Sequence, residues 1–244
     1  MQLRDNTVLI TGGASGIGLA FTKKLLALNN QVVICGRRGD KLDAAVRAYP
    51  GLIALRCDLT VKGEVATLVK TIATTFPNLN FLINNAGIQL NYRFTDGADH
   101  AEDIDTEMDA NFTSHARLTN LLLPLLQRQT AAAIVNVSSA LSVVPKESAP
   151  IYCASKAAMH IFSEALRYQL EGGTVRIFEI VPALVDTAMT AGRGRGKISP
   201  DALVDEALRG IAGDKFYIKI GKTKLLFALN RLVPSIAKRI IRGG

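Results

Sequence analysis

The sequence predicts an α/β protein of one domain, a doubly wound parallel sheet in three layers with helices on both faces. Two observations along the chain support this prediction. Short apolar runs rich in Val, Ile and Leu alternate with stretches that carry apolar residues at helical spacing. A glycine-rich turn joins the first such run to the first helical stretch. A chain of 244 residues is long enough for one large domain of this kind and too short for two.

The first part of the chain supplies three strand–helix pairs. Apolar runs predict buried strands over residues 7–11, 31–36 and 52–57. Each run is followed by a helical pattern, which predicts helices over residues 16–28, 41–48 and 62–75. Strands that alternate with helices in this way form a parallel sheet, because each helix carries the chain back to the edge where the next strand starts.

The second part of the chain continues the alternation with longer helices. Strand-like runs occur at residues 79–83, 133–137 and 175–181. Helical patterns extend over residues 105–129 and 151–171. These elements complete a sheet covered on both faces.

The last part of the chain contains a helix start, a loop and a tail. Ser199 and Pro200 begin a further helix, because Ser is favoured at the N-cap and Pro at the first helical position. The preceding residues 191–199 are rich in Gly and Arg, which predicts a mobile loop. After residues 216–220, a basic amphipathic tail follows at about residues 222–244.

The composition is that of a compact folded protein. Apolar residues make up 48% of the chain and charged residues 20%, a balance typical of ordered domains. No stretch reaches the roughly 18 consecutive apolar residues of a membrane span, and the N-terminus lacks a signal-peptide pattern. The three cysteines and three histidines are scattered without metal-ligand spacing. These features predict a cytoplasmic protein with reduced thiols and no metal site.

The net charge of +8 raises the question of a polyanionic partner. The positive residues gather in two places, one formed by Arg193, Arg195 and Lys197 and the other by residues 222–242. No nucleic-acid recognition motif accompanies them. We therefore expect no nucleic-acid partner; an anionic cofactor, an anionic substrate or a membrane surface fits this charge better.

The glycine-rich turn has the spacing of a nucleotide-binding loop. Residues 11–18 read Thr-Gly-Gly-Ala-Ser-Gly-Ile-Gly, follow the first strand and open the first helix. Gly12 permits a tight turn, Gly16 lets the backbone approach a pyrophosphate, and Gly18 allows the helix to pack closely on the strand. The helix N-terminus then offers free N–H groups to the phosphates. An ordinary strand-to-helix turn is the alternative interpretation.

A phenol and an amine lie one helical turn apart at Tyr152 and Lys156, in the run Tyr-Cys-Ala-Ser-Lys. A phenol with a pKa of about 10 is a poor base at neutral pH. A nearby cation lowers that pKa because it favours the phenolate. Tyr152 assisted by Lys156 is therefore suited to move a proton while a hydride moves on the nucleotide. Taken alone, such a pair also arises by chance on amphipathic helices.

Several motifs in order between residues 5 and 190 resemble those of the short-chain dehydrogenase/reductase family in its single-domain form. In chain order they are the loop at residues 11–18, Asp58-Leu59, Asn84-Asn85-Ala86-Gly87, Asn111, Ser138-Ser139 and Tyr152-x-x-x-Lys156. The resemblance implies a Rossmann fold and an oxidoreductase that transfers a hydride between a nicotinamide dinucleotide and a carbonyl or alcohol group of a small molecule. The end of the chain resembles the DltE-like branch of the family, which does not define a substrate.

The resemblance also implies roles for individual side chains. Tyr152 is expected to act as general acid or base, with Lys156 supplying positive charge and holding the nicotinamide ribose. Ser139 is expected to hydrogen-bond the reacting oxygen, and Asn111 to distort its helix and hold a water in a proton relay. Plainer roles remain open, because Ser139 could cap a strand end and Asn111 could be an ordinary polar helix residue. The residues expected to contact the cofactor are Thr11, Gly12, Ser15, Gly16, Ile17, Gly18, Arg37, Arg38, Asp58, Leu59, Asn85, Ala86, Gly87, Tyr152, Lys156, Pro182, Val185 and Thr187.

The end of the second strand indicates which dinucleotide is preferred. An acidic residue there usually binds the ribose 2′-hydroxyl of NAD, but this chain reads Gly36-Arg37-Arg38. A guanidinium at Arg37 can pair with a 2′-phosphate through charge-assisted hydrogen bonds, so we expect NADP (NADPH) in preference to NAD. Two points leave this open. Ser15 stands where the family has a second basic marker, and both arginines could simply solvate a loop.

Residues 1–244 are expected to form a single dinucleotide-binding domain. The loop at about residues 187–200 and the tail at about residues 222–244 are expected to shape the substrate pocket. The tail could instead pack on a partner subunit or lie on an anionic membrane as an amphipathic helix. The resemblance implies a homodimer or a homotetramer.

Two other function classes stay open. A dinucleotide-binding regulatory protein with little turnover would keep the fold, but it would have no need of Tyr152 and Lys156 together. An epimerase or dehydratase on a related scaffold usually carries a larger C-terminal substrate domain, for which this chain leaves too little length.

Overall fold

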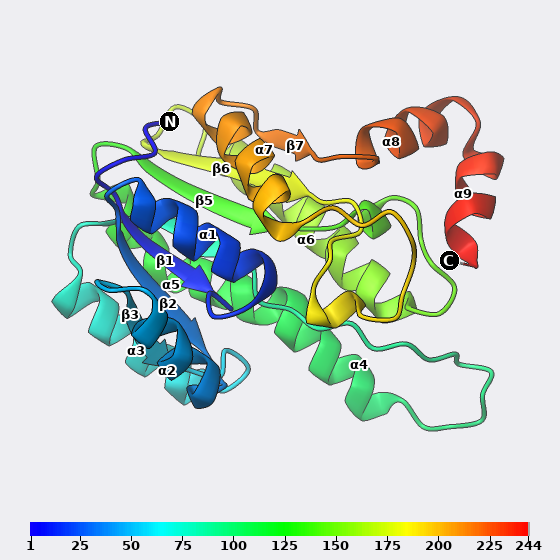
Figure 1. Cartoon of the computed structure of the whole chain (residues 1–244), viewed down its shortest axis with the longest axis horizontal. Coiled ribbons are helices and arrows are strands. Elements are labelled where there is room, and N and C mark those ends of the chain that lie inside the picture. The colour runs from blue at the N-terminus through cyan, green and yellow to red at the C-terminus, as the bar shows by residue number, and fades with distance from the viewer. Residues whose placement is uncertain (244) are drawn as a thin grey trace.

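Among residues 1–243, which the computed structural model describes, seven parallel strands form one sheet (Figure 1). The strands are β1 (Thr7–Thr11), β2 (Gln31–Gly36), β3 (Ile53–Arg56), β4 (Leu79–Asn84), β5 (Ala132–Val137), β6 (Val175–Val181) and β7 (Tyr217–Lys219). Their spatial order is β3-β2-β1-β4-β5-β6-β7. The order reverses between β1 and β4, and in doubly wound sheets a crevice opens there at the carboxyl ends of the strands.

Helices cover both faces of this sheet. They are α1 (Gly16–Ala27), α2 (Gly39–Ala48), α3 (Lys62–Thr75), α4 (Ala101–Met108), α5 (Ser114–Gln127), α6 (Pro150–Gln169), α7 (Pro200–Ala212), α8 (Thr223–Leu232) and α9 (Pro234–Arg242). The helices α1, α2 and α7 share one apolar cluster with the sheet, and α3, α5 and α6 share the cluster on the opposite face (Figure 1). The predicted three-layer, doubly wound architecture is confirmed.

The central strand β1 shows why the strands read as continuous apolar runs. Val8 and Ile10 pack into the cluster that contains Phe21 of α1, whereas Leu9 packs into the cluster that contains Leu118 of α5. All five side chains are fully buried. Successive residues of a strand point to opposite faces, so a strand covered on both sides needs an apolar residue at every position. Each of these side chains contributes roughly 1.5–3 kcal/mol on burial.

The prediction of one helix over residues 105–129 was wrong. The helical segment begins at Ala101, and a π-helical turn at Asp109–Thr113 separates α4 from α5. An apolar periodicity does not report a single wide turn of this kind, because the turn adds one residue without ending the helix. The other predicted strands and helices overlap the observed ones, and the short edge strand β7 was not predicted. The predicted cap of α7 is confirmed, since the Ser199 hydroxyl accepts a hydrogen bond from the Ala202 N–H at 3.1 Å.

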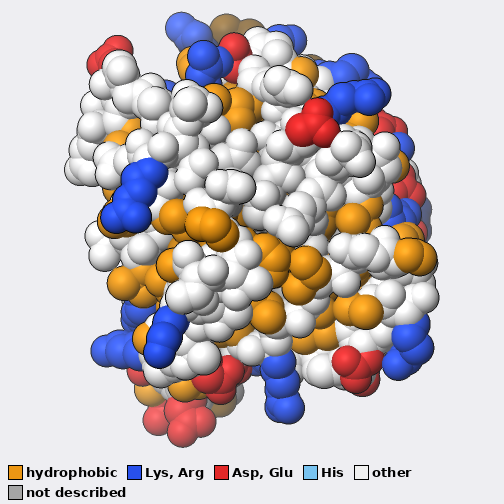
Figure 2. Space-filling model, turned by 90° about the vertical axis from the view of Figure 1, so that its left-hand side faces the viewer, with side chains coloured by type: hydrophobic (Ala, Val, Ile, Leu, Met, Phe, Trp, Pro, Cys, Tyr) orange, Lys and Arg blue, Asp and Glu red, His pale blue; other side chains and the backbone are white. Residues whose placement is uncertain are grey.

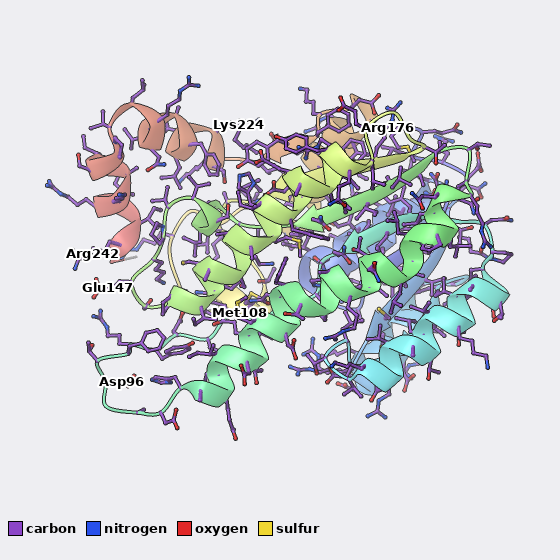
Figure 3. All side chains as sticks on the ribbon, turned by 180° about the vertical axis from the view of Figure 1, so that it is seen from behind. Asp96, Met108, Glu147, Arg176, Lys224 and Arg242 are labelled. Atoms are coloured by element: carbon purple, nitrogen blue, oxygen red, sulfur yellow. The ribbon has the colours of Figure 1, made fainter. Side chains whose placement is uncertain are left out.

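The tail forms α8 and α9 beyond the last strand, at the edge of the molecule where Figure 1 shows the chain in red. Arg242 near its end donates to the Glu147 carboxylate at 2.9 Å, and Figure 3 shows these two side chains beside each other. The tail is thus tied to the loop before α6. Leu225 and Leu232 remain 73% and 79% exposed, so α8 also carries apolar side chains that face outward.

Charged side chains on the surface are mixed in sign. On the side shown in Figure 2, Lys and Arg side chains lie around the rim with Asp and Glu between them, and apolar side chains surface in the middle. Within residues 1–243, no helix is long and apolar enough to cross a bilayer. The same part of the chain contains no cluster of His, Cys, Asp or Glu side chains that could hold a metal ion.

Candidate active site

The glycine-rich loop lines the crevice at the end of β1. Gly12 and Gly16 have φ angles of +66° and +53°, in the left-handed region that favours glycine. A Cβ on Gly18 would lie 2.2 Å from the Gly12 carbonyl oxygen, so only glycine fits where α1 passes the loop. The Ser15 hydroxyl accepts a hydrogen bond from Arg38 at 3.1 Å instead of capping α1. The N–H groups of the first helical turn therefore stay available to an anion.

The run after β4 is fastened to this loop by side chains. The Thr11 hydroxyl accepts hydrogen bonds from the N–H groups of Asn85 and Ala86, at 2.8 and 3.0 Å. The Asn85 side-chain amide in turn donates to the Thr11 carbonyl at 2.9 Å. Asn84 reaches the next strand, where its amide donates to the Asn136 side chain at 2.8 Å. These amides tie neighbouring strands together at the end of the sheet.

A cavity of about 560 Å³ extends along the carboxyl ends of the strands. Three expected cofactor contacts, Thr11, Gly18 and Val185, are not part of its lining. Thr11 and Gly18 pack against the loop residues Asn85 and Gly12 instead, and Val185 is 4% exposed. Its lining also includes residues that the sequence did not single out, such as Gln89 and Met189. The expected cofactor contacts that do line it are Gly12, Ser15, Gly16, Ile17, Arg37, Arg38, Asp58, Leu59, Asn85, Ala86, Gly87, Tyr152, Lys156, Pro182 and Thr187.

Tyr152 and Lys156 lie one turn apart on α6 and both line this cavity. The Lys156 ammonium is buried, donates to the Val137 carbonyl at 2.9 Å, and lies 5.7 Å from the centroid of the Tyr152 ring. Burial lowers the pKa of Lys156 to about 8. Lys156 therefore remains mainly protonated at neutral pH.

The pKa of the Tyr152 phenol is shifted in the direction opposite to that expected from the sequence. Desolvation raises the pKa of Tyr152 to about 12, against the lowering effects of Ser139 and Arg193. The expectation that a neighbouring cation pulls this pKa down is wrong here, because removal of the phenol from water outweighs it. The phenol is thus protonated at neutral pH and suited to donate a proton.

The two serines after β5 differ in their surroundings. The Ser138 hydroxyl donates to the buried Glu179 carboxylate at 2.5 Å. The Ser139 hydroxyl accepts from the Leu141 N–H at 3.1 Å, which caps a short 3₁₀ turn, and it also interacts with the Tyr152 phenol. As a cap, the Ser139 hydroxyl accepts a hydrogen bond through its oxygen, so the hydroxyl proton of Ser139 can still be donated. Ser139 is therefore both the predicted cap and the serine next to Tyr152.

Asn111 lies in the π-helical turn, so the distortion implied by the resemblance is present. The Asn111 side chain is fully buried, accepts from the Ile88 N–H at 2.8 Å and donates to the Ser155 hydroxyl at 3.1 Å. A Cβ on Gly87 would lie 2.8 Å from the Asn111 side-chain oxygen. The wide turn thus connects the loop after β4 with the helix that carries Tyr152 and Lys156.

Sequence reasoning missed Glu107, which is fully buried one turn before Asn111. Its carboxylate accepts from the Leu90 N–H at 2.9 Å, and burial raises the pKa of Glu107. Its position four residues before Asn111 was the available signal, because such residues share one helix face.

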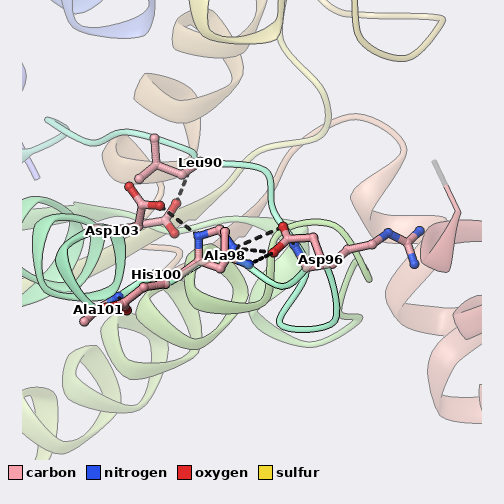
Figure 4. Close-up of polar contacts among 9 residues, drawn as sticks. Leu90, Asp96, Ala98, His100, Ala101 and Asp103 are labelled. Carbon is pink, nitrogen blue, oxygen red and sulfur yellow. Dashed lines mark hydrogen bonds and ion pairs between the residues drawn. The ribbon is translucent and has the colours of Figure 1, made fainter.

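His100 fixes the outer part of the same loop. Its Nδ1 lies 3.0 Å from the Asp103 carboxylate and its Nε2 lies 3.0 Å from the Asp96 carboxylate (Figure 4). Hydrogen bonds with Asp103 and then with Asp96 raise the pKa of His100. The ring also stacks on Tyr92, with the two centroids 4.1 Å apart. The wall of the cavity that follows β4 is therefore held from two sides, by Glu107 and by His100.

Comparison with known proteins identifies the family. The sequence model of the family described as "short chain dehydrogenase" matches residues 6–197. This chain belongs to the short chain dehydrogenase family. It is 41% identical over 189 residues to "Uncharacterized oxidoreductase DltE" from Bacillus subtilis (strain 168), which covers 78% of this chain and 75% of that relative. The resemblance drawn from the sequence motifs is confirmed.

Solved structures show the same fold. A short chain dehydrogenase from Burkholderia cenocepacia J2315 in complex with NADP superposes with a TM-score of 0.88 at 24% identity, over 99% of both chains. A short chain dehydrogenase/reductase from Burkholderia phymatum in complex with NAD superposes with a TM-score of 0.85 at 24% identity, over 100% of this chain and 98% of the other. The family identifies this chain as an NAD(P)-dependent dehydrogenase or reductase, and the solved structures show that the fold is the same over the whole chain.

The residues of the cavity fit such a dinucleotide. The left-handed backbone of Gly12 and Gly16 and the space that a Cβ on Gly18 would fill form a cradle for a backbone-bound pyrophosphate. Arg37 and Arg38, which follow β2, line the same cavity as Tyr152 and Lys156 on α6.

Acid is expected to destabilise the short chain dehydrogenase fold through His115. The His115 Nε2 lies 2.7 Å from the Ala86 carbonyl, and burial lowers the pKa of His115 to about 4. In the unfolded chain a histidine binds a proton below about pH 6.5. Between these values the unfolded chain binds more protons, so the free energy of unfolding falls by up to about 3 kcal/mol as the pH decreases from 6.5 to 4.

Denaturant titrations at several pH values check this expectation. His115→Gln should be less stable at neutral pH and should lack this part of the pH dependence. Parallel curves for wild type and variant over the acidic range would contradict it.

Proposed function

We propose that this chain reduces a carbonyl group of a small molecule with NADPH, with Tyr152 as the proton donor. The observation that carries the proposal is a protonated phenol and a buried ammonium in the lining of one cavity, with the Ser139 hydroxyl next to the phenol. Tyr152 holds its proton at neutral pH, and a protonated phenol can give its proton to a developing alkoxide, which suits the reductive direction.

Each side chain would have one part in the reaction. The bound cofactor would supply the hydride. Ser139 would donate a hydrogen bond to the carbonyl oxygen and orient it toward Tyr152. As Tyr152 loses its proton, Lys156 at 5.7 Å from the ring would stabilise the phenolate.

Asn111 would contribute through the wide turn in which it lies. A π-helical turn shifts backbone carbonyls out of the regular hydrogen-bond ladder, which makes them acceptors for water. Such a water near Asn111 and Lys156 would complete a proton relay that reprotonates Tyr152. This role was expected from the resemblance and is supported by the π turn at Asp109–Thr113.

The preference for NADP rests on the end of β2. The solved relatives hold NADP in one case and NAD in the other, so the side chains of this chain must decide. Arg37, Arg38 and Lys41 line the cavity next to Gly36. The bond from Arg38 to Ser15 places a cation beside the glycine loop although the basic marker at position 15 is missing. Three cations at this end suit a 2′-phosphate.

Arg37→Ala should weaken NADPH binding by about ten- to a hundredfold, which corresponds to the loss of a charge-assisted contact. The affinity for NADH should stay unchanged, because NADH lacks the 2′-phosphate. Arg47→Ala on the exposed side of α2 is the matched control and should bind both cofactors like wild type. Fluorescence titration measures all three proteins. NADPH affinity that is untouched by Arg37→Ala would contradict the assignment.

A cofactor-oxidation screen tests the proposed function itself. NADPH and NADH are offered with a panel of ketones, aldehydes, quinones and sugars, and loss of the reduced nicotinamide absorbance is followed. We expect turnover with NADPH on at least one class. Tight NADPH binding without oxidation on any class would favour the alternative of a dinucleotide-binding regulatory protein.

The single-domain division, the substrate loop at residues 187–200, the homo-oligomer and the cytoplasmic location stay predictions. Exposed Leu225, Leu232 and Ile240 on the tail are compatible with a second copy of the chain or with an anionic membrane. Sedimentation of the full chain and flotation with anionic vesicles distinguish the two: a dimer or tetramer that does not float would favour the oligomer.

A further inference from the structure

The loop between β6 and α7 holds its cations in a defined arrangement. Gly192, Gly194 and Gly196 alternate with two arginines, and their φ angles are +71°, +62° and +68°. Left-handed residues at every second position are open to glycine and strained for other residues. The loop is closed by parallel pairing of Val185 with Ile198. Its arginines are therefore positioned by the backbone.

The three cations of this loop have different surroundings. Lys197 Nζ donates to the Thr190 carbonyl at 2.7 Å and lies 3.6 Å from the Asp186 carboxylate, so its charge is used within the loop. Arg195 is exposed. Arg193 is the one of the three that lines the cavity containing Tyr152.

Arg193 lines that cavity, and one of its N–H donors has no partner in the described part of the chain. Its Nη2 donates to the Met189 carbonyl. Its Nη1 is buried and has no hydrogen-bond partner in the described part of the chain. None of the ion pairs found within residues 1–243 includes Arg193. A buried N–H donor without an acceptor is unfavourable, and a carboxylate oxygen would be a charge-assisted acceptor for it.

Arg193 and Tyr152 line the same cavity, so a ligand bound there beside Tyr152 can bring that acceptor. Its positive charge acts on the Tyr152 phenol and opposes the rise in pKa that desolvation causes. The carboxylates of neighbouring elements are engaged elsewhere: Asp186 lies near Lys197, and Glu107 accepts from the Leu90 N–H. An anionic ligand next to Tyr152 is therefore the partner that this geometry lacks.

We propose that Arg193 binds a carboxylate on the substrate, beside the carbonyl group that receives the proton of Tyr152. This inference rests on the proposed function and gives its substrate class, namely short oxo acids and the hydroxy acids formed from them. In the reduction, hydride forms the new C–H bond at the carbonyl carbon, the π electrons move to oxygen, and oxygen takes the Tyr152 proton while NADPH becomes NADP⁺. The carboxylate is unchanged and serves only for binding.

Binding of matched acids and amides tests this inference without turnover. The protein is saturated with NADPH, and short hydroxy acids and their primary amides are titrated by calorimetry; the reduced cofactor cannot oxidise either. We expect at least one acid to bind about ten- to a hundredfold more tightly than its amide, as a charge-assisted contact predicts. Arg193→Ala should remove this difference and keep the NADPH affinity. Arg195→Ala is the matched control on the same loop and should behave like wild type.

Two results would overturn the inference. One is equal behaviour of every acid and its amide in wild type, including no binding of either. The other is unchanged acid binding in Arg193→Ala together with weaker NADPH binding, which would assign the guanidinium to the cofactor pyrophosphate. Failure of the proposed function is distinguishable, because an acid that needs Arg193 for binding but is not oxidised with NADP⁺ would contradict hydride transfer and leave the anion site standing.

Discussion

Tyr152→Phe is expected to lower kcat/KM for carbonyl reduction by about a hundred- to ten-thousandfold, the range over which a positioned general acid contributes. The variant removes only the phenolic oxygen. Desolvation keeps that oxygen protonated in the folded chain, with a pKa of about 12. Its proton is therefore available to a developing alkoxide, and Phe has none to give. Because the ring is retained, the packing around α6 should be preserved.

Two kinds of control accompany the Tyr152→Phe variant. Its thermal midpoint and its Kd for NADPH should equal those of wild type, which separates the chemical step from folding and cofactor binding. Tyr168→Phe removes a phenol from the same helix, where the side chain is 72% exposed, and should keep full activity. Retention of most activity by Tyr152→Phe would refute the proposed proton donor.

Glu179→Ala is expected to lower the free energy of unfolding by about 3 kcal/mol. The Glu179 carboxylate on β6 is fully buried, accepts from the Ser138 hydroxyl at 2.5 Å and lies 2.8 Å from His160 Nδ1. Removing one partner of a buried ion pair usually costs about 3–5 kcal/mol. We expect the lower end of this range because His160 can lose its proton and so avoid an unpaired buried charge. Ser138 precedes Ser139, so we also expect reduced activity from a displaced Ser139.

The pH dependence of stability tests the same pair. The hydrogen bond to Glu179 raises the pKa of His160 above that of an unfolded histidine. Its contribution is therefore fully present below about pH 6.5 and is lost as the pH rises through the raised value. Glu179→Gln keeps the shape and removes the charge, so this loss should be smaller in that variant. Urea unfolding at several pH values measures both effects. A stability of Glu179→Ala within about 0.5 kcal/mol of wild type, as for an ordinary surface change, would contradict the account.

The fold could be predicted from the sequence because the pattern of apolar residues in each element indicates which of its faces are buried. Val8, Leu9 and Ile10 are apolar in succession, and only a strand covered on both faces requires that. The bounds of α4 and α5 could not be predicted in this way. The π turn at Asp109–Thr113 shifts the helical register by one residue, and a periodicity averaged over the whole helix does not reveal this shift.

The candidate site could be predicted only in part. Gly12, Tyr152 and Lys156 stand out because their chemistry depends on residue type and local spacing. The direction of the Tyr152 pKa could not be predicted, since it depends on how far the fold removes the phenol from water. The different surroundings of Arg193 and Arg195 depend on the left-handed backbone of Gly194 between them and could not be predicted from the sequence either.

The transfer of deuterium from nicotinamide-deuterated NADPH to a carbonyl substrate tests the central claim most directly. We expect wild type to place the label on the carbinol carbon of the product, and Tyr152→Phe, saturated with the same cofactor, to form this labelled product at least about a hundredfold more slowly. A product without deuterium at that carbon, or an equal yield of labelled product from Tyr152→Phe, would contradict it.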